Sequence, residues 1–414
     1  MLHNYTQSSA RWLTVLFPVT LILGHVAADV TLSLIAALFL LHSALQKQWV
    51  WCEKAWIRVL ALLWCYMIVR GVLAEHPLAA LRRALPFARY FLFAAALAYW
   101  TLSVPDTRQK FLTVLTAVVI FLTLDGLLQR VWGHDIIGRP LHLDHSNYIR
   151  LTGPFSHEML GIMLMWFSFP VCMRFILTES GTFQRPVRLY SAIAGVSLVL
   201  VTIMLSGERM ALLLAFFGWT IALWLLPVKR STLLIMIAVG LALLEMLAYM
   251  SPEVFDRQIY STLYTFEHWQ QSPYGLLLTS DSRIAETNPL FGIGTNHFHD
   301  ACEMLYPGVS QYELNSACNT HPHNVYMEFL IENGIIGLLL YLCFIAIVIS
   351  ECAKVWPQLR TNPVCIGIII MLIVHAWPIA PSTSFFSPWG APPFWLMLGW
   401  LLAYTEPLHA HHTD

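Results

Sequence analysis

Residues 318–349 read CNTHPHNVYMEFLIENGIIGLLLYLCFIAIVI and join two kinds of sequence. The first part is polar and places His321 and His323 on either side of Pro322. The second part is an almost uninterrupted apolar run over 325–350. A helix needs about 20 apolar residues to cross a bilayer, so this run predicts a membrane-spanning helix. The two histidines would then lie at a membrane surface.

The composition of the whole chain indicates the same environment. The chain has 414 residues, of which 57% are hydrophobic and only 11% are charged, and its mean hydropathy is +0.63. Soluble proteins carry about 25% charged residues. Charge is costly in hydrocarbon, so this deficit predicts an integral membrane protein. We expect membrane lipids and no nucleic acid among its partners, and an uncleaved first apolar stretch.

Apolar runs of similar length recur along the chain. They predict an all-α membrane protein of about 12 transmembrane helices, forming one membrane domain over residues 1–414. An even number of spans returns both termini to the same side. The runs lie near 12–28, 30–46, 56–73, 84–103, 110–131, 158–177, 189–206, 209–227, 231–250, 325–350, 363–380 and 391–405.

The basic residues predict the orientation, because cytoplasmic loops are enriched in Lys and Arg. If the N-terminus is cytoplasmic, every lysine of the chain falls on the cytoplasmic side. The C-terminus is then cytoplasmic as well. Only arginines remain on the opposite side, where the topology rule gives no reason for them.

Two loops on the outer side are long enough to carry a functional site. One covers roughly 132–157, and the other covers roughly 251–324 and is far longer than a simple connection requires. The second loop contains Cys302 and Cys318. Two cysteines in an oxidising compartment are expected to form a disulfide, and the alternative is a pair of free thiols.

Arg209 and Arg283 are the first candidate binding residues. In LSGERMALLL (205–214), Arg209 opens an apolar helix, where the helix dipole disfavours a cation. A bound phosphate would suit both the helix amides and the guanidinium. The alternatives are an arginine that reaches to the interface or pairs with Glu208. For Arg283 the alternative is a surface ion pair with Asp281 or Glu286.

The histidines before 325 are candidates for proton transfer. A histidine with a pKa near neutrality can take a proton from a hydroxyl group, and Asn324 is placed to cap the following helix. Two solvated loop histidines are the alternative. A second alternative is a zinc site, in which His321 and His323 would join His297 and His299.

Four stretches together resemble the O-antigen ligase and polymerase superfamily. They are RLTGPFSHEMLG (150–161), SGERMALL (206–213), SRIAETNPLFGIGTNHF (282–298) and HPHNVYMEFLIENGIIGLLL (321–340). Their order and the span pattern cover most of the chain. The single large late loop and the absence of a soluble C-terminal part resemble the ligase branch most. One departure is Glu208, where a small or polar residue is expected.

The resemblance implies a membrane glycosyltransferase with a GT-C-like architecture and an active site on the periplasmic face of the bacterial inner membrane. The implied donor is O-antigen polysaccharide on undecaprenyl diphosphate, and the acceptor is a sugar hydroxyl of lipid A-core oligosaccharide. Transfer would invert the anomeric carbon without a metal or other cofactor, and the 251–324 loop would carry part of the site.

The resemblance also assigns roles to residues. His323 is the implied general base, and Arg209 and Arg283 would bind the donor diphosphate in place of magnesium. Further substrate-binding candidates are Arg150, His321, Asn324, Arg82, Arg83 and Arg89. A polymerase of the same superfamily is the main alternative, followed by a twelve-helix transporter; a purely structural subunit would not need the outer arginines.

Overall fold

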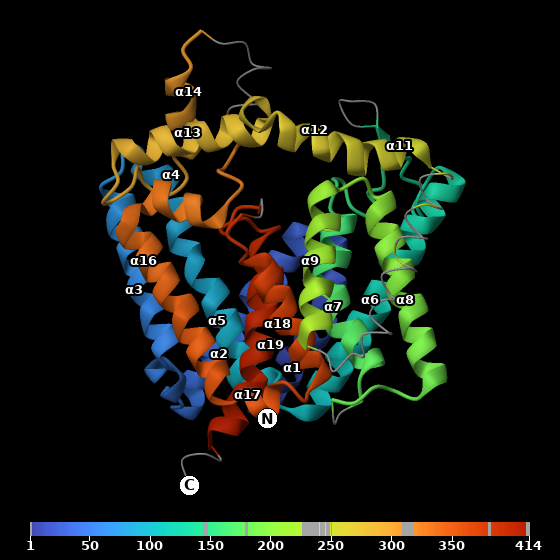
Figure 1. The fold of residues 1–414 in the computed structure, drawn as a ribbon. Coiled ribbons are helices and arrows are strands. Elements are labelled where there is room, and N and C mark those ends of the chain that lie inside the picture. Colours follow the sequence, from blue (N-terminus) through green and yellow to red (C-terminus); the bar gives the residue numbers. More distant parts are fainter. Residues whose placement is uncertain are drawn as a thin grey trace.

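The computed structural model describes residues 2–143, 148–178, 181–225, 251–308, 318–379 and 382–410, and the single residues Gly240, Glu245 and Tyr249. Nearly all of this structure is helical. One two-stranded antiparallel ribbon pairs β1 (His142–Leu143) with β2 (Ile149–Arg150). Long helices run side by side as a bundle, and both chain termini lie at one end of it (Figure 1).

The bundle helices follow the apolar runs closely. Their bounds are α1 (Leu2–Leu23), α2 (His25–Gln46), α3 (Ala55–Val72), α4 (Pro77–Ala84), α5 (Ala88–Ala96), α6 (Pro105–Trp132), α7 (Leu160–Ile176), α8 (Pro186–Leu205), α9 (Arg209–Leu225), α16 (Val325–Lys354), α18 (Pro363–His375) and α19 (Ala391–Ala410). Short turns at Val50–Glu53 and α17 (Trp356–Leu359) connect neighbouring helices.

Five of these helices are long and apolar enough to cross a membrane: α2, α3, α6, α8 and α16. Helices α7, α9 and α18 are apolar but shorter. The prediction of an all-α membrane protein is confirmed. The number of spans stays a prediction, and the expected span at 231–250 lies outside the described residues apart from Gly240, Glu245 and Tyr249.

The expected span at 84–103 has a more irregular structure than predicted. Helix α4 passes through a 3-10 turn at Leu85–Phe87 into α5, which continues as a π-helical turn at Leu97–Thr101. Pro86 lies inside the 3-10 turn. Proline has no amide hydrogen to donate, so it disturbs the helical ladder at this point.

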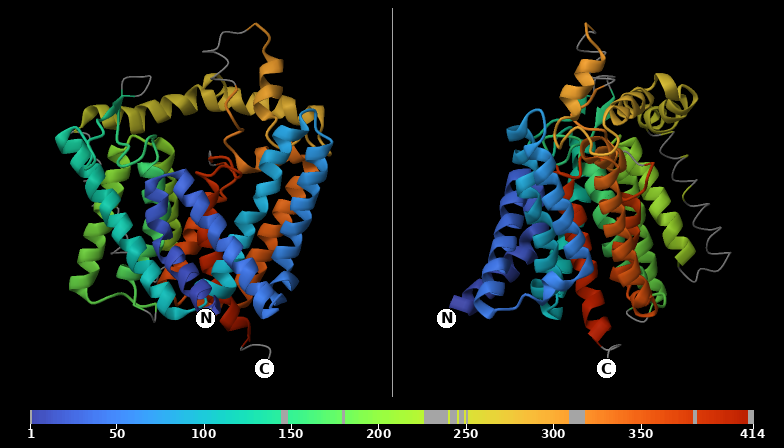
Figure 2. Two further views of the ribbon diagram at one scale, coloured as in Figure 1. Left: turned by 180° about the vertical axis from the view of Figure 1, so that it is seen from behind. Right: turned by 90° about the vertical axis from the view of Figure 1, so that its left-hand side faces the viewer.

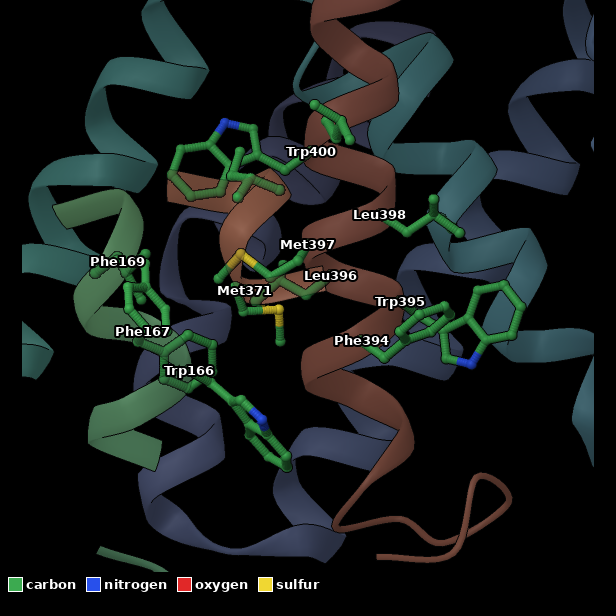
Figure 3. Close-up of a cluster of buried hydrophobic side chains, with 14 of the residues drawn as sticks. Trp166, Phe167, Phe169, Met371, Phe394, Trp395, Leu396, Met397, Leu398 and Trp400 are labelled. Atoms are coloured by element: carbon green, nitrogen blue, oxygen red, sulfur yellow. The ribbon is translucent and has the colours of Figure 1, made fainter. Parts of the chain in front are cut away.

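Large aromatic and sulfur-containing side chains fill the centre of the bundle. Figure 3 shows Trp395 on one side of α19, and Trp400 of α19, Met371 of α18 and Trp166 of α7 on its other side. These four side chains are almost entirely buried. Helices α7 and α18 approach very closely, since a Cβ atom on Gly367 would lie 2.3 Å from the Cα atom of Pro170.

The long loop forms a layer of helices across the end of the bundle opposite the termini (Figures 1 and 2). The layer consists of α11 (Pro252–Phe255), a π-helical turn (Asp256–Tyr260), α12 (Ser261–Glu267), a 3-10 turn (Trp269–Gln271) and α13 (Pro273–Thr287). Helix α14 (Phe298–Leu305) projects above α13 (Figure 1).

The segment after α13 docks into a break in α16. Gly334 interrupts α16 with φ 66°, and a Cβ atom there would lie 2.3 Å from the Leu290 carbonyl oxygen. The Ile335 amide donates to the Pro289 carbonyl at 2.8 Å, so the break lets two backbones pair. Only glycine suits this conformation and distance. Two of the sequence motifs, in 282–298 and 321–340, therefore meet here.

Candidate functional site

A cavity of about 480 Å³ lies where the layer of loop helices covers the ends of α7 and α9. Its walls come from six parts of the chain: β2, the segment before α7, the start of α9, the loop helices, the segment before α16 and the segment before α19. The lining residues are Arg150, Glu158, Met159, Ile162, Gly207, Glu208, Arg209, Met210, Ala211, Arg257, Pro273, Tyr274, Leu277, Asn319, His323, Ser382 and Thr383. The cavity thus brings His323 and Arg209 together.

Arg209 is held by the loop helix above it. Its Nη1 atom donates to the Ser261 carbonyl oxygen and to Thr265 Oγ1, each at 3.1 Å. Both acceptors are uncharged, so these bonds orient the guanidinium without neutralising its charge. Hydrogen bonds to neutral groups are compatible with a further anionic partner.

Glu208 does not pair with Arg209 and instead binds the start of α7, a helix earlier in the chain. Its two carboxylate oxygens accept hydrogen bonds from the Gly161 amide at 2.8 Å and the Ile162 amide at 3.1 Å. These amides belong to the first turn of α7, where helices lack internal acceptors. Burial raises the pKa of Glu208 to about 7. The unexpected acidic residue of the SGERMALL motif therefore caps α7.

Arg150 and Arg257 complete a basic wall around the 206–208 turn. Arg150 Nε donates to the Ser206 carbonyl at 3.2 Å, and Arg257 Nε donates to the Gly207 carbonyl at 2.9 Å. Arg150 was a predicted binding residue, whereas Arg257 was not. In the sequence Arg257 lies in the long 251–324 loop, and no motif connects it with Arg209. Three arginines and two glutamates, Glu158 and Glu208, therefore line one cavity.

His321 and His323 lie together at the edge of this cavity, although only His323 lines it. Their ring centroids are 4.1 Å apart, and the His323 carbonyl accepts from the Ser382 amide at 2.5 Å. His323 has φ 52°, an unusual conformation for a residue with a side chain. Burial lowers the pKa of both imidazoles, that of His321 to about 3. Both rings are therefore uncharged at neutral pH.

Asn324 caps α16, as the sequence predicts. Its Oδ1 atom accepts from the amides of Tyr326 at 3.0 Å and Met327 at 3.1 Å. Its Nδ2 atom donates to the Pro378 carbonyl at 2.7 Å. The side chain is therefore engaged on both sides, and it fixes the start of α16 directly after His323.

The remaining predicted arginines lie outside the cavity lining. Arg283 is exposed on α13, and Arg82 is exposed on α4. Arg89 forms an ion pair with Asp29 of α2, with an N–O distance of 2.8 Å. Arg83 is half-buried and lies close enough to His321 that its charge is a minor cause, after burial, of the lowered pKa of that imidazole.

The four histidines of the alternative zinc site do not converge. His297 Nε2 accepts from the His76 amide at 3.1 Å, while His299 lies 3.3 Å from a Glu303 carboxylate oxygen. Within the described part of the chain, no three His, Cys, Asp or Glu side chains form a group that could hold a metal ion.

A disulfide joins Cys302 of α14 to Cys318, with a Cα–Cα distance of 5.6 Å. Both cysteines are buried in a small apolar cluster with Phe298 and Ile331. The bond ties α14 to the segment that continues through Asn319 to His323, so it restrains one wall of the cavity.

Glu328 supports the opposite wall. Its carboxylate accepts hydrogen bonds from the Ser384 hydroxyl and, at 2.8 Å, from the Phe385 amide. The segment held in this way begins with Ser382, which pairs with the His323 backbone. Glu328 thus holds a segment that in turn pairs with the backbone of His323.

We expect Glu328→Ala to lower activity and Glu328→Gln to retain much of it. Alanine would leave the Phe385 amide and the Ser384 hydroxyl without their acceptor, which costs about 1–3 kcal/mol, whereas glutamine can still accept from the amide and donate to the hydroxyl. Activity and thermal unfolding of both variants would be measured together. The positioning role would be contradicted if Glu328→Ala and Glu328→Gln lost equal activity while their unfolding temperatures were the same.

The fold and the cavity define a helical membrane protein with a basic site at one end of its bundle. Residues 194–342 match the family model Wzy_C, which is described as O-antigen ligase. The match spans three of the four motifs, and RLTGPFSHEMLG lies before it. Over these residues the match bears out the predicted resemblance to the O-antigen ligase superfamily. No significant match to a curated protein was found.

Proposed function

We propose that the protein is an O-antigen ligase, a membrane glycosyltransferase that transfers O-antigen polysaccharide from undecaprenyl diphosphate to a sugar hydroxyl of lipid A-core oligosaccharide. The observation that carries the proposal is the shared cavity of His323 and Arg209 at one end of an apolar bundle. Both substrates are lipid-anchored, so a site at the end of the bundle suits their meeting.

The proposed step is a single displacement at the anomeric carbon of the donor sugar. The acceptor oxygen forms a bond to this carbon while the bond to the diphosphate oxygen breaks. His323 accepts the acceptor's hydroxyl proton, and undecaprenyl diphosphate leaves with the bonding electron pair. A single displacement inverts the anomeric configuration.

In this proposal, arginines stabilise the leaving diphosphate. Arg209 takes this role with Arg150 and Arg257, because all three line the cavity and donate several hydrogen bonds in a fixed geometry. Arg283 remains the second donor residue implied by the motifs, although its exposed place on α13 would require the donor to extend over that helix.

The acceptor would approach from the side of α4 and the segment before α16. Arg82 and Arg83 of α4 are proposed to meet phosphates of the lipid A core, and His321 and Asn324 to border the acceptor site. Arg89 has a weaker case, because its guanidinium is already paired with Asp29.

The proposed topology places the active site on the periplasmic side of the membrane. We propose about 12 transmembrane helices with a GT-C-like architecture, in one membrane domain over residues 1–414. The termini would be cytoplasmic, and residues 251–324 would form the periplasmic loop. The helices of this loop supply Arg257, Tyr274 and Leu277 to the cavity. The polymerase of the same superfamily is the alternative function, because the matched family region is shared by both branches.

The acidic limb of the pH profile should lie below pH 6.5. Burial lowers the pKa of His323, so its imidazole stays neutral and able to accept a proton below the usual histidine pKa of about 6.5. Activity that needs this neutral form falls only as the pH decreases through the lowered value. The measurement is kcat/KM for transfer as a function of pH, and a midpoint above 6.5 would argue against His323 as the base.

Transfer by purified protein should survive an excess of EDTA. The physical reason is that guanidinium groups can stabilise the departing diphosphate in place of a metal ion. The assay compares initial rates with and without EDTA in the same preparation. Loss of activity that Zn²⁺ or Mg²⁺ restores would show that a metal ion takes part.

A further inference from the structure

A second and larger hollow lies at the other end of the bundle, far from His323. It has a volume of about 770 Å³ and runs between α6 and α8, with α7 contributing residues near Arg174. Figure 1 shows α6 and α8 at one edge of the bundle, with their first residues at the end that holds the chain termini. The groove is therefore separate from the proposed active site.

The groove has the length of one bilayer leaflet. Its lining extends along α6 from Gln109 to Leu124, and along α8 from Val187 to Val199. At 1.5 Å per residue, the α6 side is about 22 Å long. A bilayer with its headgroups is about 40–45 Å thick, so one leaflet measures about 20–22 Å. A lipid molecule lying upright in one leaflet would fill this length.

The walls and the end of the groove differ in chemistry. Exposed apolar side chains, among them Ile120, Val187 and Leu198, line most of its length. Arg174, Arg188, Gln109 and Gln184 all lie at the end near the chain termini. Among the described residues that line the groove there is no Asp or Glu. An apolar channel that ends in two cations matches an acyl chain attached to an anionic headgroup.

We propose that this groove binds one anionic glycerophospholipid from the leaflet at the end of the termini. One acyl chain lies between α6 and α8, and the phosphate is bound by Arg174 and Arg188. Arginine suits this role because its guanidinium donates two parallel hydrogen bonds to phosphate oxygens. The amides of Gln109 and Gln184 are available to the glycerol part of the headgroup. This inference is independent of the proposed function.

The test is native mass spectrometry of the purified full-length protein titrated with phosphatidylglycerol or phosphatidylethanolamine. The wild-type protein should bind one phosphatidylglycerol more tightly than phosphatidylethanolamine. Arg174→Gln with Arg188→Gln should weaken phosphatidylglycerol binding about 30-fold, the effect expected for two cations near a lipid phosphate. Binding of phosphatidylethanolamine should change much less.

Two further variants make the test specific. Gly195 lies within the groove, and a Cβ atom built on it meets no other atom within 4 Å. Gly195→Leu should therefore fill the groove without disturbing the fold, and should weaken binding of both lipids. Arg185→Gln is the matched control, because Arg185 is exposed just before α8 and does not line the groove.

Three results would overturn the proposal. They are equal binding of the two phospholipids by the wild-type protein, unchanged binding by Gly195→Leu, and a stronger preference for an isoprenyl phosphate than for phosphatidylglycerol. Size-exclusion elution and thermal unfolding of each variant would establish that it is folded, so that a loss of binding refers to the groove.

Discussion

His323→Ala is expected to abolish measurable transfer while leaving expression and membrane insertion intact. A general base contributes about 10²–10⁴-fold to the rate, and alanine has no group that can accept the acceptor's proton. The substitution also removes only an imidazole that lies at the cavity edge, outside the apolar centre of the bundle. Transfer would be measured with purified protein, donor and acceptor.

His321→Ala is the matched control. Its ring lies 4.1 Å from that of His323, yet it does not line the cavity, and burial lowers its pKa to about 3. We expect this variant to keep measurable activity. If His321→Ala were inactive and His323→Ala active, the base would be His321. If both variants kept full activity, neither histidine would be the base.

Arg209→Lys should lose most activity although it keeps the positive charge. An ammonium group cannot reproduce the fixed fork of a guanidinium, which here must hold Ser261 and Thr265 as well as a diphosphate. The loss should be about 10²-fold, similar to the removal of one donor to a developing negative charge. Binding of undecaprenyl diphosphate should weaken in parallel.

Two other arginines give the comparison. Arg89→Lys should leave donor binding unchanged, since lysine can preserve the ion pair with Asp29. Arg283→Lys is predicted from the motifs to lose activity. A large loss would indicate that the donor reaches Arg283 on α13. Wild-type donor affinity in both Arg209→Lys and Arg283→Lys would contradict the arginine clamp.

The sequence was sufficient to predict most of the bundle, because crossing hydrocarbon leaves a strong and local signal. The run at 325–350 became α16 at Val325–Lys354, and the cap by Asn324 could be read from its position alone. Boundaries were less accurate where proline or irregular turns intervene. The run at 84–103 contains Pro86 and is divided between α4, α5 and two irregular turns.

The site was only partly predictable, because its contacts join segments far apart in the chain. The position of Glu208 suggested an ion pair with its neighbour Arg209. The carboxylate instead accepts from the amides of Gly161 and Ile162 in α7, which lies earlier in the sequence. No periodicity or residue spacing in a sequence predicts that a carboxylate will cap a different helix. For the same reason Arg257 was not predicted, although it lines the same cavity as Arg209.

The most direct test of the central proposal is the lipopolysaccharide profile of a deletion strain, examined together with its lipid-linked polysaccharide. The ligase assignment predicts lipid A-core without long chains, while full-length polymer remains on undecaprenyl diphosphate. Expression of the wild-type protein should restore the long chains, and the His323→Ala variant should not. Single repeat units in place of polymer would instead identify a polymerase, and an unchanged profile would contradict both assignments.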